Sequence, residues 1–176
     1  MSEHLHRLAR EIAAGNDDIG ALVILGILRR GRPLAERFAR LIGELTGTFP
    51  PVGSLATTLY RDDVKTGRAI GAAHGQTHFD FNVDERTVLL VDDVLAAGRT
   101  IRAAMDEVMD YGRPARIQLA CLVDRGGREL PIQADYLGWS MASGRDEWVS
   151  VHLEEIDGED AVLVERYPDG DETEGA

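Results

Sequence analysis

Two adjacent carboxylates, Asp92 and Asp93, directly follow an apolar run at residues 88–91. Like charges this close repel each other and neither gains from burial, so something outside the chain is expected to compensate them. A small turn at residues 96–98 follows, and Thr100 then opens a helical pattern. The backbone N–H groups at a helix start favour an anion. The stretch can therefore hold a phosphate close to hydroxyl groups or a metal, which is the layout of a sugar phosphate.

Other motifs that place an aspartate at a strand end fit this stretch less well. It has neither a Walker lysine nor a GxGxxG pattern. A phosphoryl-accepting receiver domain would carry its acidic pair after the first strand and would not need the glycine and threonine at 98 and 100. If Asp93 merely capped a turn, Asp92 would remain unexplained.

The elements that must position these carboxylates alternate between strand and helix. Apolar runs predict buried strands at 21–25, 52–60, 87–91 and 115–123, and helical spacing predicts helices at 4–14, 33–45 and 100–111. Residues 26–32, 61–86 and 124–140 are expected to be loops, and 147–153 with 161–167 form an expected hairpin that has Asp157-Gly158 near its turn. This order indicates an α/β fold with a parallel sheet covered on both faces. Ligands in such sheets bind at the carboxyl ends of the strands, where Asp92 and Asp93 lie.

The length of 176 residues fits a single domain, expected at 1–167, followed by an acidic and disordered tail at 168–176. The longest apolar runs are far too short to cross a bilayer, and the N-terminus lacks the apolar core of a signal peptide, so a cytoplasmic protein without a membrane partner is expected. Cys121, the only cysteine, lies in an apolar run and is expected to be a buried structural thiol.

The net charge is −12, and Lys65 is the only lysine among the cationic side chains. An acidic, lysine-poor surface suits strong salt, where screening removes self-repulsion. A GC-rich genome, which favours arginine codons over lysine codons, explains the composition equally well, and both explanations stay open. In either case a strongly negative protein is a poor generic binder of nucleic acid, because phosphate contacts need local positive charge.

Four segments together carry a resemblance to a known family. The stretch VLLVDDVLAAGRT (88–100) resembles the phosphoribosyl pyrophosphate (PRPP) signature of type I phosphoribosyltransferases. The segments LGILRRG (25–31), TLYRDD (58–63) and GRPARIQLACLVDRGGRELPIQADYLG (112–138) resemble, more narrowly, the PyrR family. The resemblance extends from about Leu5 to Tyr167.

This resemblance implies a fold, an activity and partners. The fold would be that of type I phosphoribosyltransferases: a mainly parallel sheet flanked by helices, with a small hood and a C-terminal hairpin. The activity would be uracil phosphoribosyltransferase, which makes UMP and pyrophosphate from uracil and PRPP with Mg²⁺. Members of the family also bind pyrimidine-operon messenger RNA and attenuate transcription, and a homodimer or higher homo-oligomer is expected.

The resemblance also assigns roles in the PRPP site. Asp93 and Arg61 would be the catalytic residues, and Asp92 and Asp93 would hold the ribose hydroxyls. Ala97 stands where the family usually has a hydroxyl residue, so one hydrogen bond to the phosphate is lost, typically worth ~1–3 kcal/mol. The expected PRPP-binding residues are Asp92, Asp93, Val94, Leu95, Ala96, Ala97, Gly98, Arg99 and Thr100.

Three further segments receive roles by the same resemblance. The guanidinium groups of Arg29 and Arg30 suit a diphosphate. Residues 64–86 would form a lid, in which His74 and His78 are interpreted as exposed polar residues. The hood, residues 124–138, would bind uracil. The pyrophosphate loop is Leu28, Arg29, Arg30 and Gly31; the mobile loop begins with Arg61, Asp62 and Asp63; the base-binding residues are Arg125 and Val149.

The RNA face of the family is a basic concave surface, to which Arg7, Arg10 and Arg128 could belong. Gln133 and Trp139 stand where the family is typically basic, and Gly127 stands where it often has histidine. Three interpretations therefore remain: a uracil phosphoribosyltransferase, an RNA-binding regulator that senses UMP with little turnover, and a phosphoribosyltransferase for another base. The bifunctional assignment combines the first two.

Overall fold

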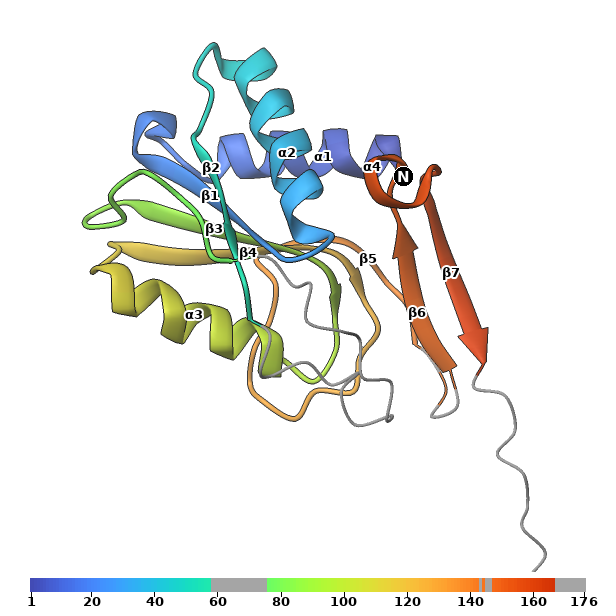
Figure 1. Ribbon diagram of the computed structural model, residues 1–176. Helices are drawn as coiled ribbons and strands as arrows, with labels where there is room; N and C mark the ends of the chain where they lie inside the picture. The colour runs from blue at the N-terminus through green and yellow to red at the C-terminus, as the bar shows by residue number, and fades with distance from the viewer. Residues whose placement is uncertain (58–75, 143, 145–146, 167–176) are drawn as a thin grey trace, which may run out of the picture.

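The computed structural model describes residues 1–57, 76–142, 144 and 147–166. Its centre is a five-stranded sheet with the strand order β2-β1-β3-β4-β5, in which every neighbouring pair is parallel (Figure 1). The strands are β1 (Leu22–Ile27), β2 (Val52–Leu55), β3 (Thr87–Leu95), β4 (Arg116–Asp124) and β5 (Tyr136–Ser140). The expected α/β fold with a parallel sheet is confirmed.

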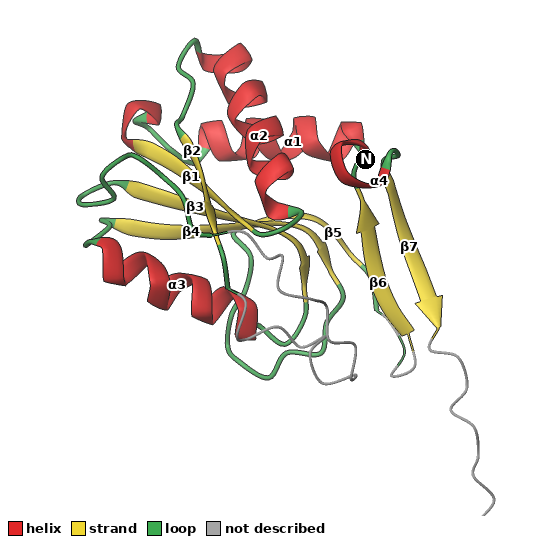
Figure 2. Ribbon diagram, viewed as in Figure 1, coloured by secondary structure: helices red, strands yellow, loops and turns green. Residues whose placement is uncertain are grey.

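Helices cover both faces of this sheet, as Figure 2 shows. The helices α1 (Ser2–Ala14) and α2 (Gly31–Thr46) pack on one face, and α3 (Arg99–Tyr111) packs on the other. Side chains along β1 alternate accordingly, with Leu22 and Ile24 in the first core and Val23 and Leu25 in the second. Because both faces are buried, the central strands contain uninterrupted apolar stretches, such as 22–25 in β1 and 88–91 in β3. No helix in the described part of the chain is long and apolar enough to cross a membrane.

Two expected strands have different ends in the structure. The strand expected at 87–91 is longer in the structure. It is β3, which continues through Asp92 and Asp93 to Leu95 and pairs with β4 as far as Asp124. The strand expected at 52–60 is β2, which ends at Leu55 opposite the last residue of β1. Within the expected loop 61–86, His78 pairs with Ser54 in an antiparallel bridge. The ladders with neighbouring strands, rather than the local sequence, set these boundaries.

The expected loop at 124–140 was wrong at its C-terminal end, since it contains β5. A Cβ atom at Gly138 would lie 2.1 Å from the carbonyl oxygen of Leu122, so the close approach of β4 and β5 requires glycine there. The helix expected from Pro33 begins two residues earlier, at Gly31.

The expected hairpin is confirmed as the antiparallel pair β6 (Glu147–His152) and β7 (Ala161–Arg166). Its connection includes a one-turn helix that was not predicted, α4 (Glu154–Asp157), and Gly158 ends that helix with φ 79°. A short 3-10 helix at Ile19–Ala21 precedes β1. Val149, Val151 and Leu153 anchor the hairpin to the core beneath α1 and α2.

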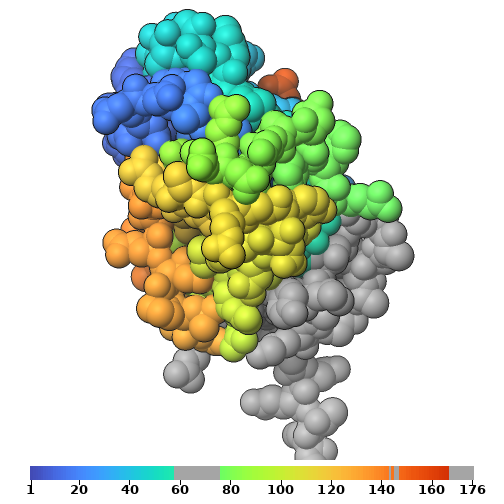
Figure 3. Space-filling view, turned by 90° about the vertical axis from the view of Figure 1, so that its left-hand side faces the viewer, coloured from blue at the N-terminus to red at the C-terminus, as the bar shows by residue number. Residues whose placement is uncertain are grey.

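The loops that precede the strands close one end of the sheet. Arg86 donates to the carbonyl of Gly20 at 2.6 Å and accepts from the backbone N–H of Ala115 at 2.9 Å. Glu85 donates its backbone N–H to the carbonyl of Arg113 at 2.9 Å. Figure 3 shows these blue, green and yellow segments packed side by side on this face. The loops after the strands lie at the opposite edge of the sheet, where the expected ligand site lies.

Candidate functional site

The sheet order gathers the predicted site segments at one edge. Because all five strands are parallel, the loops that follow them leave the sheet on the same side. In the order β2-β1-β3-β4 these are the chain after Leu55, the loop at 28–30, the turn at 96–98 and the segment after Asp124. The sequence separates these segments by up to about a hundred positions, and the parallel topology makes them neighbours.

Asp92 and Asp93 lie within β3 near its carboxyl end. Asp92 is only 7% exposed, and Asp93 is half-buried. The carboxylate of Asp92 accepts the backbone N–H of Asp93 at 3.0 Å, and the carboxylate of Asp93 accepts that of Val94 at 3.0 Å. The chain therefore holds two neighbouring carboxylates near the carboxyl end of β3, one of them almost wholly buried.

Cys121 lies beside Asp92 in the ladder between β3 and β4 and is fully buried. Burial, reinforced by the negative charges of Asp92 and Asp93, raises the pKa of its thiol well above the usual value. A thiol in this environment stays protonated and unreactive at neutral pH. The expected buried structural thiol is confirmed.

The predicted pyrophosphate loop, residues 28–31, is packed tightly against β3. A Cβ atom at Gly31 would lie 2.3 Å from the carbonyl oxygen of Val91, and one at Gly26 would lie 2.4 Å from the carbonyl oxygen of Gly31. The peptide bond between Leu28 and Arg29 is cis. The glycines thus let the loop lie directly beside the strand that carries the two aspartates.

The two arginines of this loop differ in their surroundings. Arg29 is exposed, and no described side chain forms an ion pair with it. Arg30 binds Asp157 of α4 through two hydrogen bonds of 2.9 and 3.2 Å. Arg30 thus ties the loop to the hairpin connection, and the binding of a diphosphate by the two arginines stays a prediction.

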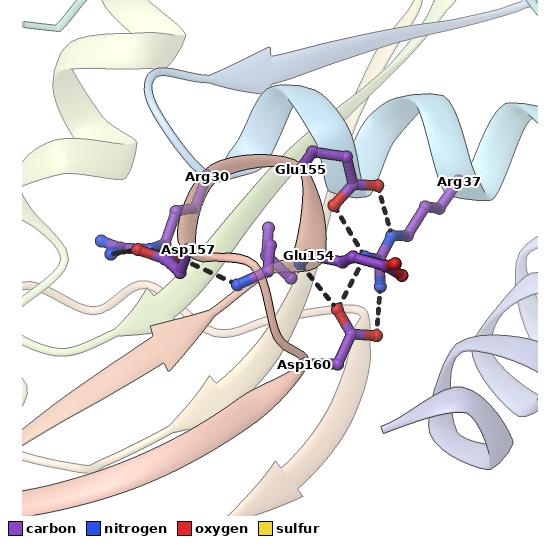
Figure 4. A network of polar contacts seen from close by, with 7 residues as sticks. Arg30, Arg37, Glu154, Glu155, Asp157 and Asp160 are labelled. Atoms are coloured by element: carbon purple, nitrogen blue, oxygen red, sulfur yellow. Dashed lines mark hydrogen bonds and ion pairs between the residues drawn. The ribbon is translucent and has the colours of Figure 1, made fainter.

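Arg37 of α2 holds the same connection at a second point, as Figure 4 shows. Its guanidinium binds both Glu155 and Asp160 in bidentate fashion, at distances between 2.7 and 2.8 Å. These bonds raise the pKa of Arg37 and lower the pKa values of Glu155 and Asp160, while the bond from Arg30 lowers the pKa of Asp157. The carboxylates of Asp157 and Asp160 also accept the backbone N–H groups of Leu153 and Glu154.

This network predicts a pH-dependent contribution to stability. Replacing Arg37 with methionine is expected to lower the free energy of unfolding at pH 7 by about 1–2 kcal/mol, allowing for solvent screening of the partly exposed carboxylates. Because the folded-state pKa values of the carboxylates are depressed, the contribution is fully present above their ordinary values of about 4 and is lost as the pH falls through the depressed values. Urea denaturation of both proteins between pH 7 and 2.5 measures the difference.

Arg40→Met is the matched control, since Arg40 lies on the same helix, is exposed and forms no ion pair with any described residue. It should leave the unfolding free energy nearly unchanged at every pH. A difference between Arg37→Met and wild type that stays constant down to pH 2.5 would contradict the ion-pair explanation.

The predicted phosphate loop leads into the N-terminus of α3 and packs against the hood. Gly98 precedes the helix with φ 93°, a conformation that favours glycine. Ala97 is buried, and its carbonyl accepts the backbone N–H groups of Glu129 and Leu130, both at 3.1 Å. Arg99 forms an ion pair with Glu129. The hood segment thus lies directly against the turn that is expected to hold the phosphate.

Of the two base-binding candidates, Arg125 adjoins this turn. The backbone N–H of Arg125 donates to the carbonyl of Leu95 at 3.0 Å, so the hood begins where β3 ends. Val149 is buried in β6, where it pairs with Val164 and packs into the first core. The candidates Arg61, Asp62 and Asp63, together with His74, lie outside the described residues. His78 is exposed, as expected, and no group of three or more metal-ligating side chains occurs in the ranges that the structure describes.

Comparison with known proteins identifies the family. The family model for the phosphoribosyl transferase domain matches residues 1–165. The "Bifunctional protein PyrR" of Pelotomaculum thermopropionicum is 52% identical over 160 residues, which cover 91% of this chain and 88% of that protein. The protein of the same name from Clostridioides difficile is 48% identical over 164 residues, covering 93% and 92% of the two chains.

The chain belongs to the PyrR family. Among solved structures, it resembles the hypoxanthine phosphoribosyltransferase of Trypanosoma cruzi with a TM-score of 0.64 at 17% identity, over 93% of this chain and 90% of that one. A hypoxanthine-guanine phosphoribosyltransferase of Bacillus anthracis aligns with a TM-score of 0.62 at 19% identity, over 84% and 78%. At such low identity the likeness establishes the phosphoribosyltransferase fold alone.

The three RNA candidates of this PyrR-family chain lie in different environments. Arg7 binds Glu11 and the carbonyls of Leu137 and Gly138, and so ties α1 to β5. Arg128 is engaged inside the hood, while Arg10 is exposed and makes no ion pair or hydrogen bond with a described residue. The structure therefore gathers the PRPP candidates at one edge but does not gather the three arginines into one patch of free cations.

Sequence reasoning missed the contacts of Arg30 and Arg37 with the hairpin connection. The only sequence signal for these contacts is the acidic run EEIDGED at 154–160, within which Asp157-Gly158 predicts a turn. An acidic run beside a hairpin is usually solvated, and its partners lie more than a hundred positions away in the chain.

Proposed function

We propose that this chain is a cytoplasmic uracil phosphoribosyltransferase that converts uracil and PRPP to UMP and pyrophosphate. The observation that carries the proposal is the arrangement around β3. Two carboxylates, one of them buried, are followed directly by the turn that opens α3, and the arginine-bearing loop after β1 lies alongside. Relatives about half identical over nine-tenths of the chain bear the name "Bifunctional protein PyrR".

The proposed site divides PRPP among three groups. Asp92 and Asp93 accept hydrogen bonds from the ribose hydroxyls, and the turn from Val94 to Thr100 binds the 5-phosphate through backbone N–H groups. Arg29 faces the pyrophosphate together with the backbone of the loop. Uracil lies between the hood and this site, and its N1 attacks the anomeric carbon as pyrophosphate departs.

Catalysis in this proposal consists of positioning and electrostatics. The anomeric carbon acquires positive charge as the bond to pyrophosphate breaks, and the Asp93 carboxylate stabilises that charge. Arg61 would offset the negative charge that builds on pyrophosphate. Paired carboxylate oxygens suit a hard cation, and Mg²⁺ bound with PRPP would neutralise part of the diphosphate charge.

The direct test is UMP formation from uracil and PRPP with Mg²⁺, measured by chromatography in low KCl and in molar KCl. Turnover with uracil, and none with hypoxanthine, guanine or adenine, is the expected result. Turnover with a purine instead would show that the base substrate is a purine and not uracil. UMP binding without turnover would make the nucleotide a regulatory ligand. A rise in rate with KCl would support the interpretation of the acidic surface as salt-adapted.

We propose, as the second half of a bifunctional protein, that a homo-oligomer of this chain binds pyrimidine-operon messenger RNA in response to UMP. The names of the relatives support this half, and Arg10 is the exposed cation that can contribute to it. Gel-shift titration of a leader RNA with and without UMP, at low and high salt, tests the proposal. RNA affinity that does not depend on UMP would contradict the proposed response to the nucleotide. RNA affinity that Arg10→Gln leaves unchanged would contradict the role of Arg10.

Ala97 gives a sharp prediction for the phosphate site. Replacing Ala97 with serine places a hydroxyl in the turn, where it can donate one charge-assisted hydrogen bond to the 5-phosphate. The KM for PRPP is expected to fall by roughly tenfold with kcat little changed, since such a bond is worth about 1–3 kcal/mol. Initial-rate kinetics measure the change. Ala103→Ser in the middle of α3 is the control, and an unchanged KM in Ala97→Ser would show that the turn already saturates the phosphate.

A further inference from the structure

The side chain of Arg128 joins three segments around the phosphate turn. Its Nε donates to the carbonyl of Ile132 at 2.7 Å, and its Nη1 donates to the carbonyl of Ala96 at 2.6 Å. Its Nη2 donates to the carboxylate of Asp124, at the end of β4. The side chain is 25% exposed. A planar guanidinium with several fixed donors can bridge three acceptors in this way, whereas an ammonium group acts as a single point charge.

Donors of the hood therefore form hydrogen bonds with two successive carbonyl groups of the phosphate turn. Arg128 binds the carbonyl of Ala96, and the backbone N–H groups of Glu129 and Leu130 bind the carbonyl of Ala97. In a planar trans peptide the carbonyl and the following N–H point in opposite directions. The N–H groups of Ala97 and Gly98 thus point away from the hood, and neither has a hydrogen-bond acceptor among the residues that the structure describes.

The turn needs this external support because its own sequence does not fix it. It consists of two alanines and a glycine, and the glycine adopts a left-handed conformation with φ 93°. Without a donor to hold it, the carbonyl of Ala96 could rotate toward the site and place a partial negative charge beside an anionic ligand. Arg128 opposes that rotation, because one of its donors holds the Ala96 carbonyl while the other two are fixed by Ile132 and Asp124.

We propose that Arg128 is a positioning residue for the 5-phosphate: by holding the carbonyl of Ala96 against the hood, it turns the backbone N–H groups of the turn toward the phosphate. This inference rests on the proposed function, because it assumes that a 5-phosphate binds at the turn. It gives Arg128 a task other than direct contact with RNA, for which its charge is already compensated by Asp124.

The experiment compares the affinities of UMP and uridine, which differ only in the 5-phosphate, in Arg128→Met, Arg128→Lys and wild type. Isothermal titration calorimetry or ligand competition gives the ratio of the two dissociation constants. In Arg128→Met the preference for UMP over uridine is expected to fall by about tenfold or more, while uridine affinity stays within about twofold. Arg128→Lys is expected to lie between the two, because an ammonium group can still reach one carbonyl. Arg40→Gln, at an exposed arginine of α2 outside the proposed binding surfaces, is the control and should keep the wild-type ratio.

The outcomes separate the possible failures. If wild type binds UMP no more tightly than uridine, the proposed function fails and the role of Arg128 fails with it. If wild type prefers UMP and both Arg128 variants keep that preference, the positioning role alone is overturned. Equal weakening of UMP and uridine would indicate a general structural role, and a loss confined to RNA affinity would indicate an RNA contact; each would overturn the proposal.

Discussion

Replacing Asp93 with asparagine is expected to lower kcat/KM for UMP formation by roughly 10²–10³-fold, the usual cost of removing a preorganised group that stabilises charge in a transition state. Asparagine keeps the size of the side chain and can still accept the backbone N–H of Val94, which the carboxylate accepts at 3.0 Å. It removes the negative charge beside the anomeric carbon. The loss should fall mainly on kcat, because the ground-state ribose carries no positive charge.

Asp106→Asn is the matched control for this prediction. Asp106 lies on α3, and its exposed carboxylate pairs with Arg102 at 3.2 Å. Such a surface pair contributes little, so the control should retain both activity and stability. Initial rates at saturating uracil, with PRPP varied, separate kcat from KM. Wild-type kcat in Asp93→Asn would place the chemistry away from the aspartate pair and would contradict the proposed mechanism.

Asp92 and Asp93 stand out in the sequence as site candidates because two adjacent carboxylates are unfavourable to bury. Two adjacent aspartates at the end of an apolar run have no structural explanation by themselves, and the topology places them near the carboxyl end of a parallel strand. Their strand was nevertheless expected to end too early. Aspartate is a poor strand former, but the ladder with β4 continues past it, and tertiary pairing overrides that local preference.

Long-range packing accounts for what the sequence did not reveal. The strand β5 contains Gly138, which by local rules argues against a strand, and only the close approach to Leu122 explains it. Arg30, predicted to bind a diphosphate, also binds Asp157, and this partner lies 127 positions away in the chain. Arg128 looked like a surface cation from its sequence, and its three acceptors become neighbours only in the folded hood. An arginine's charge can be read from a sequence, whereas its partners depend on the fold.

Replacing Gly31 with alanine is expected to lower both the stability of the protein and its affinity for pyrophosphate. A Cβ atom there would lie 2.3 Å from the carbonyl oxygen of Val91. The nearest atoms, from Val91 and Gly26, all belong to the backbone, so no flexible side chain can make room. Gly31→Ala should therefore push the loop at 28–30 away from β3, lowering the free energy of unfolding by about 1–3 kcal/mol, as overpacking commonly does. Because that loop carries Arg29, inhibition by pyrophosphate should weaken by roughly tenfold, the equivalent of about 1.4 kcal/mol.

Gly47→Ala separates this steric effect from the loss of a glycine as such. Gly47 ends the same helix, α2, with φ 77°, and a Cβ atom there would meet nothing within 4 Å. Its replacement should cost about 1 kcal/mol through the strained backbone conformation while leaving pyrophosphate inhibition unchanged. Urea denaturation and product-inhibition kinetics on both variants make the comparison. Should Gly31→Ala weaken pyrophosphate no more than Gly47→Ala does, the contact between the loop and β3 would be irrelevant to the ligand. Both variants are expected to lose stability, but only Gly31→Ala should lose affinity for pyrophosphate, because only its added methyl group displaces the loop from the strand that carries the aspartates.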